Sequence, residues 1–151
     1  MSRVVYVNGS YVPEEQGKIS IFDRGFLFAD GIYEVTAVVK RRLVDYDAHM
    51  ERLERSLGEI RLDWPCSKEA LKAMHLDMVK RNNLDEGWVY MQITRGSADR
   101  DFKFPKGVKP TLIAFTQAKK LVDNPDAVRG VSVITVPDIR WARRDIKSVM
   151  L

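Results

Sequence analysis

A chain of 151 residues can form one compact domain, or one small domain and the beginning of another. Hydrophobic residues make up 45% of the chain and charged residues 30%, a balance typical of globular proteins that excludes the disordered and fibrous classes. The apolar runs are too short to cross a bilayer, and the first residues lack the layout of a signal peptide. We therefore expect a cytoplasmic protein without membrane contact.

The net charge of +4 raises the question of nucleic-acid binding. Basic residues are nevertheless scattered among acidic ones, as in residues 51–55, and do not gather into a basic patch. Dispersed arginines suit small anionic ligands such as phosphates and carboxylates. Nucleic acid is therefore not an expected partner.

Metal ligands are also few. Cys66 is the only cysteine, so the chain can form neither an intrachain disulfide nor a thiolate cage. The two histidines, His49 and His75, fall in separate predicted helices without ligand spacing, and we expect both to be partly exposed. No metal site is predicted.

The chain opens with the pattern of a β-hairpin. Two short apolar runs flank Asn8-Gly9, a pair that favours the positive φ angles of a type I′ turn. The runs predicted as strands are Val4–Val7 and Ser10–Val12.

A long strand is predicted after a less regular segment. Residues 19–28 show a mixed pattern that Gly25 is expected to interrupt. Residues 32–39 are rich in β-branched side chains, which favour a strand. A turn at residues 40–42 then predicts a second strand over residues 43–46.

Two helices follow. Asp47 fits an N-cap, and apolar residues recur at helical spacing over residues 48–61. The apolar face of this helix comprises Met50, Leu53, Leu57 and Ile60. After a break at Trp64-Pro65, Ser67 is expected to cap a second helix that ends near Asn82. Its buried side comprises Leu71, Met74, Met78 and Val79.

Two more strands complete the predicted domain. Residues 87–94 and 111–116 have strand patterns, and a polar loop over residues 97–107 separates them. This mixture of strands and helices predicts an α+β fold.

The composition changes after this domain. Residues 119–129 are polar and predict a linker, and residues 130–136 predict a new strand. We therefore divide the chain into an α+β domain at 1–118, the linker at 119–129 and the start of a second domain at 130–151. The chain stops inside an apolar run, which we interpret as truncation.

Near the end of the chain, Lys147 closely follows Arg143 and Arg144. Repulsion between like charges favours the neutral amine, which is the nucleophilic form of lysine. A solvated basic loop is the commoner outcome for such a segment, and the spacing alone favours that interpretation.

A second segment, residues 22–35, places two acids and two glycines before the predicted strand, with Tyr33 near the start of that strand. This arrangement fits a loop that lines a pocket. A tight turn beside a core tyrosine fits the same pattern.

Two arginines are candidates for anion binding. Arg52 flanks the apolar face of the first helix, where it fits a phosphate ligand or, more commonly, a surface salt bridge to Glu51 or Glu54. Arg100 lies between two aspartates, so it is either neutralised in place or available as a bidentate carboxylate clamp.

Taken in order, these segments resemble the D-amino-acid transaminases, a family of fold-type IV pyridoxal-phosphate enzymes. Four blocks carry the resemblance. They are Asp23-Arg24-Gly25 with Phe28-x-Asp30-Gly31-x-Tyr33-Glu34-Val35; His49-x-x-Arg52-Leu53; Tyr90-x-Gln92-x-Thr94-Arg95-Gly96; and Asp138-Ile139-Arg140-Trp141-x-Arg143-x-Asp145-Ile146-Lys147-Ser148. The resemblance implies the N-terminal two-layer α/β domain of that fold, followed by the first strand and the lysine segment of its cofactor-binding domain.

The resemblance implies pyridoxal 5′-phosphate as the cofactor. Lys147 matches the lysine that forms the internal aldimine with the cofactor and moves the proton between Cα and C4′. Arg52 matches the arginine that binds the cofactor phosphate. Glu34 and Arg140 match residues close to the lysine, with supporting roles.

The resemblance also implies D-amino acids and 2-oxo acids as substrates, for example D-alanine and 2-oxoglutarate. Tyr33 matches the pocket tyrosine near the substrate carboxylate. Arg100 matches the arginine of the carboxylate trap, which in the family comes from the neighbouring subunit, so a homodimer is implied.

Two departures from the family pattern bear on activity. Phe102 stands where the trap usually has a histidine, which removes one carboxylate donor and favours apolar D-amino acids over dicarboxylates. Enzymes of the family are also considerably longer, so this chain alone is expected to be inactive. Branched-chain L-transaminases, (R)-amine transaminases and aminodeoxychorismate lyases share the fold and stay as alternatives, although residues 31–35 and 90–96 favour the D-specific branch.

Overall fold

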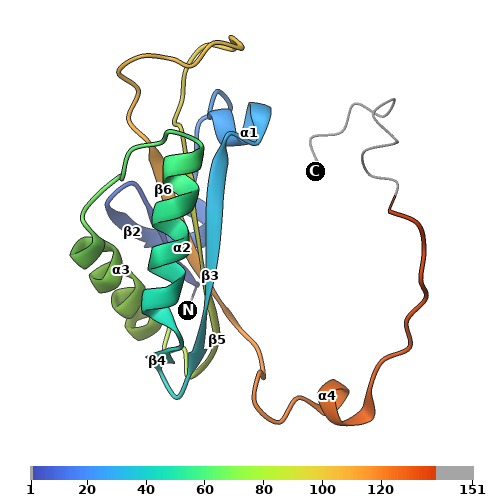
Figure 1. Ribbon diagram of the computed structural model, residues 1–151. Coiled ribbons are helices and arrows are strands. Elements are labelled where there is room, and N and C mark those ends of the chain that lie inside the picture. The colour runs from blue at the N-terminus through green and yellow to red at the C-terminus, as the bar shows by residue number, and fades with distance from the viewer. Residues whose placement is uncertain (1, 139–151) are drawn as a thin grey trace.

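The computed structural model describes residues 2–138. Figure 1 shows one sheet with two long helices on one of its faces, and a C-terminal segment that leaves the sheet. Within the described residues the sheet has six strands in the order β2-β1-β6-β5-β3-β4, and every neighbouring pair is antiparallel. The predicted α+β fold is thus confirmed.

The first two strands form the hairpin that the sequence predicts. β1 (Val4–Val7) pairs with β2 (Ser10–Pro13). Asn8 and Gly9 between them have φ angles of 47° and 97°, the positive values that a two-residue turn of this type requires. A short 3-10 helix, η1 (Glu14–Gln16), follows the hairpin.

Three long strands form the other side of the sheet, together with one short strand. They are β3 (Gly31–Val39), β5 (Glu86–Thr94), β6 (Thr111–Ala118) and the short β4 (Arg42–Leu43). β4 pairs only with the end of β3, so the first part of β3 has an open edge on that side among the described residues. The strand predicted over residues 43–46 is mostly absent, because the chain turns into a helix there.

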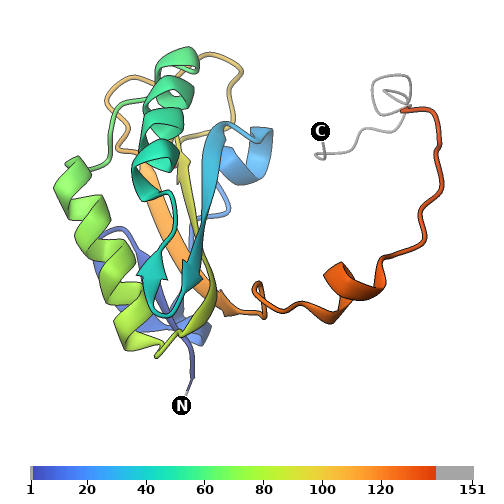
Figure 2. The ribbon, with the colours of Figure 1, turned by 60° about the horizontal axis from the view of Figure 1, so that its bottom comes forward.

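Two long helices, α2 (Tyr46–Glu59) and α3 (Lys68–Arg81), cover one face of the sheet, as Figures 1 and 2 show. Their apolar sides meet the inward side chains of the strands in a single core. The fully buried side chains of this core include Leu53, Leu57, Leu71, Met78, Val89, Met91 and Ile93. No helix within residues 2–138 is long and apolar enough to cross a membrane.

The two helices begin differently. Ser67 caps α3 as predicted, its hydroxyl accepting a hydrogen bond from a backbone N–H of the first turn at 3.2 Å. Asp47 does not cap α2, which begins one residue earlier at Tyr46, after Asp45 in a left-handed conformation. Tyr46 is buried and packs edge-on against His75, so core packing rather than capping chemistry determines where α2 begins.

The helix α1 (Arg24–Phe28) is absent from the sequence prediction, because Gly25 is expected to interrupt this segment. Asp23 caps α1, its carboxylate accepting a hydrogen bond from the Gly25 N–H at 2.9 Å. A side chain at position 25 would collide with the methyl group of Thr94. The glycine therefore permits close packing of α1 on β5 and does not break the helix.

His75 is fully buried, so the expectation of partial exposure is wrong for this histidine. Its Nδ1–H donates to the Leu71 carbonyl at 2.8 Å. Burial lowers the pKa of His75, which favours the neutral imidazole. Because Leu71 lies four residues earlier on the apolar side of α3, helical spacing already places His75 on that side.

The chain leaves the sheet after β6, and residues 119–138 are mostly exposed. The predicted linker contains a five-residue helix, α4 (Pro125–Arg129), which Asn124 caps. The strand predicted over residues 130–136 is absent, because these residues have no neighbouring strand among the described residues with which to share hydrogen bonds.

Gly25→Ala is expected to lower the free energy of unfolding by about 1–3 kcal/mol, because the added methyl group overpacks against Thr94. Gly58→Ala in α2 is the matched control. A Cβ at position 58 meets no atom within 4 Å, so alanine is expected to stabilise the protein by about 0.5–1 kcal/mol through its higher helix propensity. Urea unfolding measures both changes, and changes of the same sign would contradict the packing explanation.

Candidate functional site

β3 presents its side chains alternately to the two faces of the sheet, which separates the candidate residues Tyr33 and Glu34. Glu34 lies on the face covered by the helices and is only 3% exposed. Tyr33 lies on the other face and is 65% exposed. Neighbours in the sequence therefore have opposite surroundings in the fold.

Two side chains of α2 hold the Glu34 carboxylate. The Arg52 guanidinium donates to both carboxylate oxygens, from Nε and Nη2, each at 2.7 Å. The His49 Nδ1–H donates to Glu34 Oε2 at 2.8 Å. Residues three positions apart lie on the same side of a helix, so one turn of α2 supplies both partners.

The pKa of Glu34 lies below its ordinary value. Burial acts to raise this pKa, but the hydrogen bonds from Arg52 and then His49, together with their charges, outweigh burial. The carboxylate therefore stays ionised and holds the Arg52 guanidinium in one orientation.

Arg52 combines a fixed orientation with accessibility, since its side chain is 56% exposed. It pairs with Glu34 and not with Glu51 or Glu54, the surface partners considered from the sequence. The hydrogen bonds to Glu34 raise the pKa of Arg52, and Tyr33 adds a smaller electrostatic contribution in the same direction.

On the face without long helices, Tyr33 is the end of a row of stacked rings. Its ring stacks on Tyr90 of β5 with the centroids 5.6 Å apart, and Tyr90 stacks on Phe115 of β6 at 4.8 Å. The Tyr90 hydroxyl donates to Gln92 Oε1 at 2.8 Å. Stacking limits the motion of the Tyr33 ring and still leaves it accessible to a ligand.

Arg100 lies in the connection between β5 and β6. Its guanidinium lies over the rings of Phe28 and Phe102, 5.1 and 5.2 Å from their centroids. Within residues 2–138 no ion pair joins Arg100 to the two aspartates beside it. Neutralisation by a direct ion pair is therefore not seen there, and the carboxylate clamp stays a prediction.

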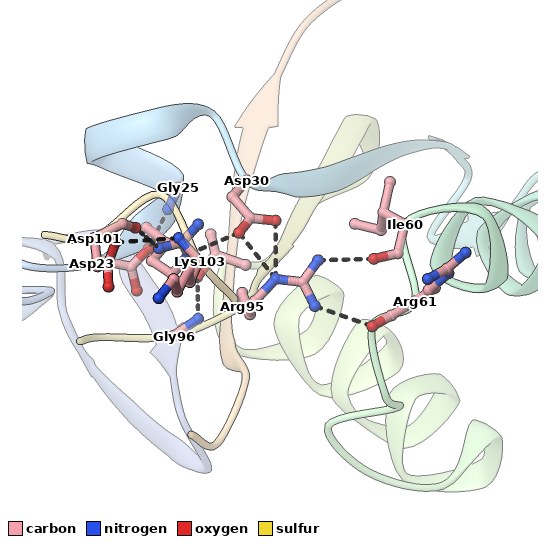
Figure 3. Close-up of polar contacts among 11 residues, drawn as sticks. Asp23, Gly25, Asp30, Ile60, Arg61, Arg95, Gly96, Asp101 and Lys103 are labelled. Carbon is pink, nitrogen blue, oxygen red and sulfur yellow. Dashed lines mark hydrogen bonds and ion pairs between the residues drawn. The ribbon is translucent and has the colours of Figure 1, made fainter. Parts of the chain in front are cut away.

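A second carboxylate, the mostly buried Asp30, lies just before β3, where Figure 3 shows it facing Arg95. Arg95 Nε donates to the two oxygens of Asp30 at 3.1 and 2.9 Å, and Arg24 Nε donates to one of them at 2.8 Å. Burial acts to raise the pKa of Asp30, but the hydrogen bonds from Arg95 and Arg24 bring it below the ordinary value. We call these three residues the Asp30 cluster.

The Asp30 cluster lines a hollow of about 520 Å³. A pocket-lining loop is what the sequence predicts for residues 22–35, although Tyr33 does not line this hollow. Sequence reasoning gives the cluster no role. The available signal is that each of its three residues belongs to a family motif without an assigned function.

The candidate residues are not all brought together. Glu34 and Arg52 are paired, whereas Tyr33 lies on the opposite face of the sheet and Arg100 lies on a separate loop. Lys147 and Arg140 lie outside the described residues, so their roles stay predictions.

Solved enzymes of fold type IV share this fold. The branched-chain amino acid aminotransferase of Escherichia coli matches with a TM-score of 0.75 and 18% identity, over 84% of this chain and 43% of that one. The branched-chain aminotransferase of Thermoproteus uzoniensis, solved with norvaline, matches with a TM-score of 0.70 and 21% identity, over 78% and 41%. The 4-amino-4-deoxychorismate lyase of Pseudomonas aeruginosa has a TM-score of 0.61 and 21% identity, over 92% and 43%. At these identities the likeness shows the fold alone.

The chain belongs to the class IV amino-transferase family, whose sequence model matches residues 31–151. The D-alanine aminotransferase of Staphylococcus epidermidis is 43% identical over 150 residues, which make up 97% of this chain and 52% of that protein. The D-alanine aminotransferase of Bacillus licheniformis is 36% identical over 149 residues, with the same shares. This chain therefore spans about half the length of the curated relatives it matches, and the predicted family is confirmed.

Glu34→Gln is expected to remove part of the loss of stability at low pH, since glutamine cannot take up a proton. The folded-state pKa of Glu34 is lowered, so its stabilisation is complete above the unfolded value of about 4.3 and is lost as the pH falls through the lower folded value. Glu51→Gln, exposed on the same helix, is the control and is expected to keep the original pH dependence. Urea unfolding from about pH 7 to about pH 3 measures the profiles, and a Glu34→Gln profile parallel to the original one refutes the ion-pair account.

Proposed function

We propose that the protein carrying this chain is a pyridoxal-phosphate-dependent D-amino-acid transaminase. It transfers an amino group between a D-amino acid such as D-alanine and a 2-oxo acid such as 2-oxoglutarate. Membership of the class IV amino-transferase family supports the reaction class. Relatives named D-alanine aminotransferase, with 36% and 43% identity over most of this chain, support the D-amino acid as substrate.

The observation that carries the proposal is the ion pair between Glu34 and Arg52. The ion pair fixes the orientation of the Arg52 guanidinium. Within residues 2–138, Arg52 Nη1 makes no hydrogen bond. A phosphate dianion fits such a group through charge-assisted hydrogen bonds. We therefore assign Arg52 to the cofactor phosphate and Glu34 to the orientation of Arg52.

When bound, pyridoxal phosphate supplies the electron sink that makes the substrate Cα–H bond acidic. We assign Lys147 as the residue that holds the cofactor covalently before substrate arrives and whose Nζ atom removes and returns the Cα proton. Arg140 is assigned a supporting role near Lys147. These two assignments rest on the family motif, since both residues lie outside the described part of the chain.

We assign the substrate carboxylate to Tyr33 and Arg100. The exposed ring of Tyr33, held by stacking on Tyr90, supports contact with a bound ligand. The Arg100 guanidinium, unpaired with its neighbouring aspartates, supports capture of a carboxylate, and we propose that it does so in the neighbouring subunit of a homodimer. Phe102 is 79% exposed and favours apolar D-amino acids over dicarboxylates, since a phenyl ring donates no hydrogen bond to a second carboxylate.

The complete protein is expected to transfer the amino group of D-alanine to 2-oxoglutarate, with kcat/KM for D-alanine on the order of tenfold or more above that for L-alanine. Formation of D-glutamate measures the reaction. L-Leucine as donor tests the branched-chain alternative, and pyruvate release from aminodeoxychorismate without an acceptor tests the lyase. Absence of transfer from every D-amino acid tried would overturn the proposal.

Lys147→Ala is expected to lower kcat by about 10²- to 10⁴-fold, because no other assigned group moves the Cα proton. The visible absorbance of covalently held cofactor is expected to disappear in the same variant. Lys80→Ala on the exposed side of α3 is the control and is expected to keep both properties. Borohydride reduction followed by peptide mapping locates the label, and a label on any lysine other than Lys147 contradicts the assignment.

A further inference from the structure

The Asp30 cluster joins three segments, of which the one that carries Arg95 lies 65 positions along the chain from Asp30. Arg24 belongs to α1, Asp30 lies just before β3, and Arg95 follows β5. Arg24 and Arg95 are buried, the Asp30 side chain is 11% exposed, and the two guanidinium groups share this single carboxylate. Removal of that carboxylate would leave two buried positive charges facing each other, so the cluster depends on Asp30.

The remaining donors of the two arginines bind backbone carbonyls on opposite sides of the cluster. Arg95 Nη1 and Nη2 donate to the carbonyls of Arg61 and Ile60, at 2.9 and 2.7 Å, beyond the end of α2 (Figure 3). Arg24 Nη1 donates to the carbonyl of Asp101 at 2.8 Å. The cluster thus connects the end of α2 with the residue that follows Arg100.

Aromatic contacts reinforce this connection. Phe104 packs beneath Arg95, with the guanidinium carbon 4.3 Å from the ring centroid. Phe28 lies beneath Arg24 at 4.7 Å and also beneath Arg100 at 5.1 Å. The ring of Phe28 is therefore shared between the buried cluster and the candidate carboxylate ligand.

Residues 99–106 have few other attachments. Within the described chain, the bond from Arg24 to Asp101 is the one hydrogen bond that joins residues 99–106 to another segment. The bond from the Lys103 N–H to the Asp101 side chain stays within the loop. Loss of the Arg24 contact would leave this segment attached mainly through its exposed phenylalanines.

We propose that Asp30, acting through Arg24 and Arg95, is a positioning residue that holds the loop over residues 97–107 so that Arg100 is directed at the substrate carboxylate. This proposal rests on the role assigned to Arg100 above. A less ordered loop is expected to weaken carboxylate binding and to leave the proton transfer unchanged, because that step is assigned to Lys147, which is not a member of the cluster. The expected signature is a higher KM with an unchanged kcat.

Asp30→Asn tests the proposal in the complete holoenzyme, since asparagine keeps the shape of the side chain and removes its charge. We expect hydrogen exchange in residues 97–107 to accelerate, KM for D-alanine to rise about tenfold, and kcat to change less than about twofold. Glu59→Gln is the matched control, because Glu59 lines the same hollow and has no contact with the cluster. It is expected to change none of the three quantities.

A double-mutant cycle separates positioning from general damage. In an Arg100→Met background, Asp30→Asn is expected to change KM by less than about twofold, because the group it positions is already absent. A tenfold rise in that background would overturn the proposal. Phe104→Ala removes the ring beneath Arg95 and leaves all three charges of the cluster in place, so it tests the attachment of the loop even if Asp30→Asn does not fold.

The failure of this proposal is distinguishable from the failure of the proposed function. Unchanged exchange of residues 97–107 in both Asp30→Asn and Phe104→Ala overturns the positioning role, whatever Arg100 binds. Faster exchange with an unchanged KM supports the attachment of the loop by the cluster, and it contradicts the carboxylate role of Arg100.

Discussion

Two carboxylates near the start of β3, the buried Glu34 and the mostly buried Asp30, are kept ionised by the guanidinium groups that pair with them. An unpaired buried charge costs several kcal/mol, so the fold must bring Arg24 and Arg95 to Asp30, and Arg52 to Glu34. These arginines come from α1, from the end of β5 and from α2. The two ion clusters therefore attach the start of β3 to three neighbouring segments, and the candidate residues described here are oriented by those attachments.

The register of β3 determines what each of its residues can do. A shift of one position would bury Tyr33 beneath α2 and expose Glu34, which would remove both the accessible ring and the support for Arg52. Gly31 contributes to this register, because a Cβ at its position would lie 2.6 Å from the carbonyl oxygen of Ile93. Close backbone approach and charge pairing thus favour the same alignment of β3 on β5.

Local patterns in the sequence predict most of the fold, and contacts between distant segments account for what they miss. Strand alternation and helical spacing identify the long strands and both long helices, since these patterns are set by near neighbours. The helix through Gly25 and the early start of α2 at Tyr46 depend on packing against other elements. For the site, the family motifs name Glu34 and Arg52 without revealing that they pair. The sequence does not reveal the Asp30 cluster either, because Arg95 lies 65 positions from Asp30 along the chain.

The arginines of the family motifs differ in how many of their guanidinium N–H groups already donate to protein oxygens. This difference separates structural roles from ligand-binding roles. Arg95 directs its Nε and both terminal nitrogens at protein oxygens, so it has little capacity for a ligand. Arg52 donates from two nitrogens to Glu34, and its Nη1 forms no hydrogen bond within residues 2–138. Arg100 lies over two rings and forms no hydrogen bond or ion pair within the same residues. A sequence motif identifies these residues as arginines and does not show which of their donors are already hydrogen-bonded. The hydrogen bonds of Arg95 indicate a structural role, whereas the donors that remain on Arg52 and Arg100 are compatible with the anion-binding roles proposed for them.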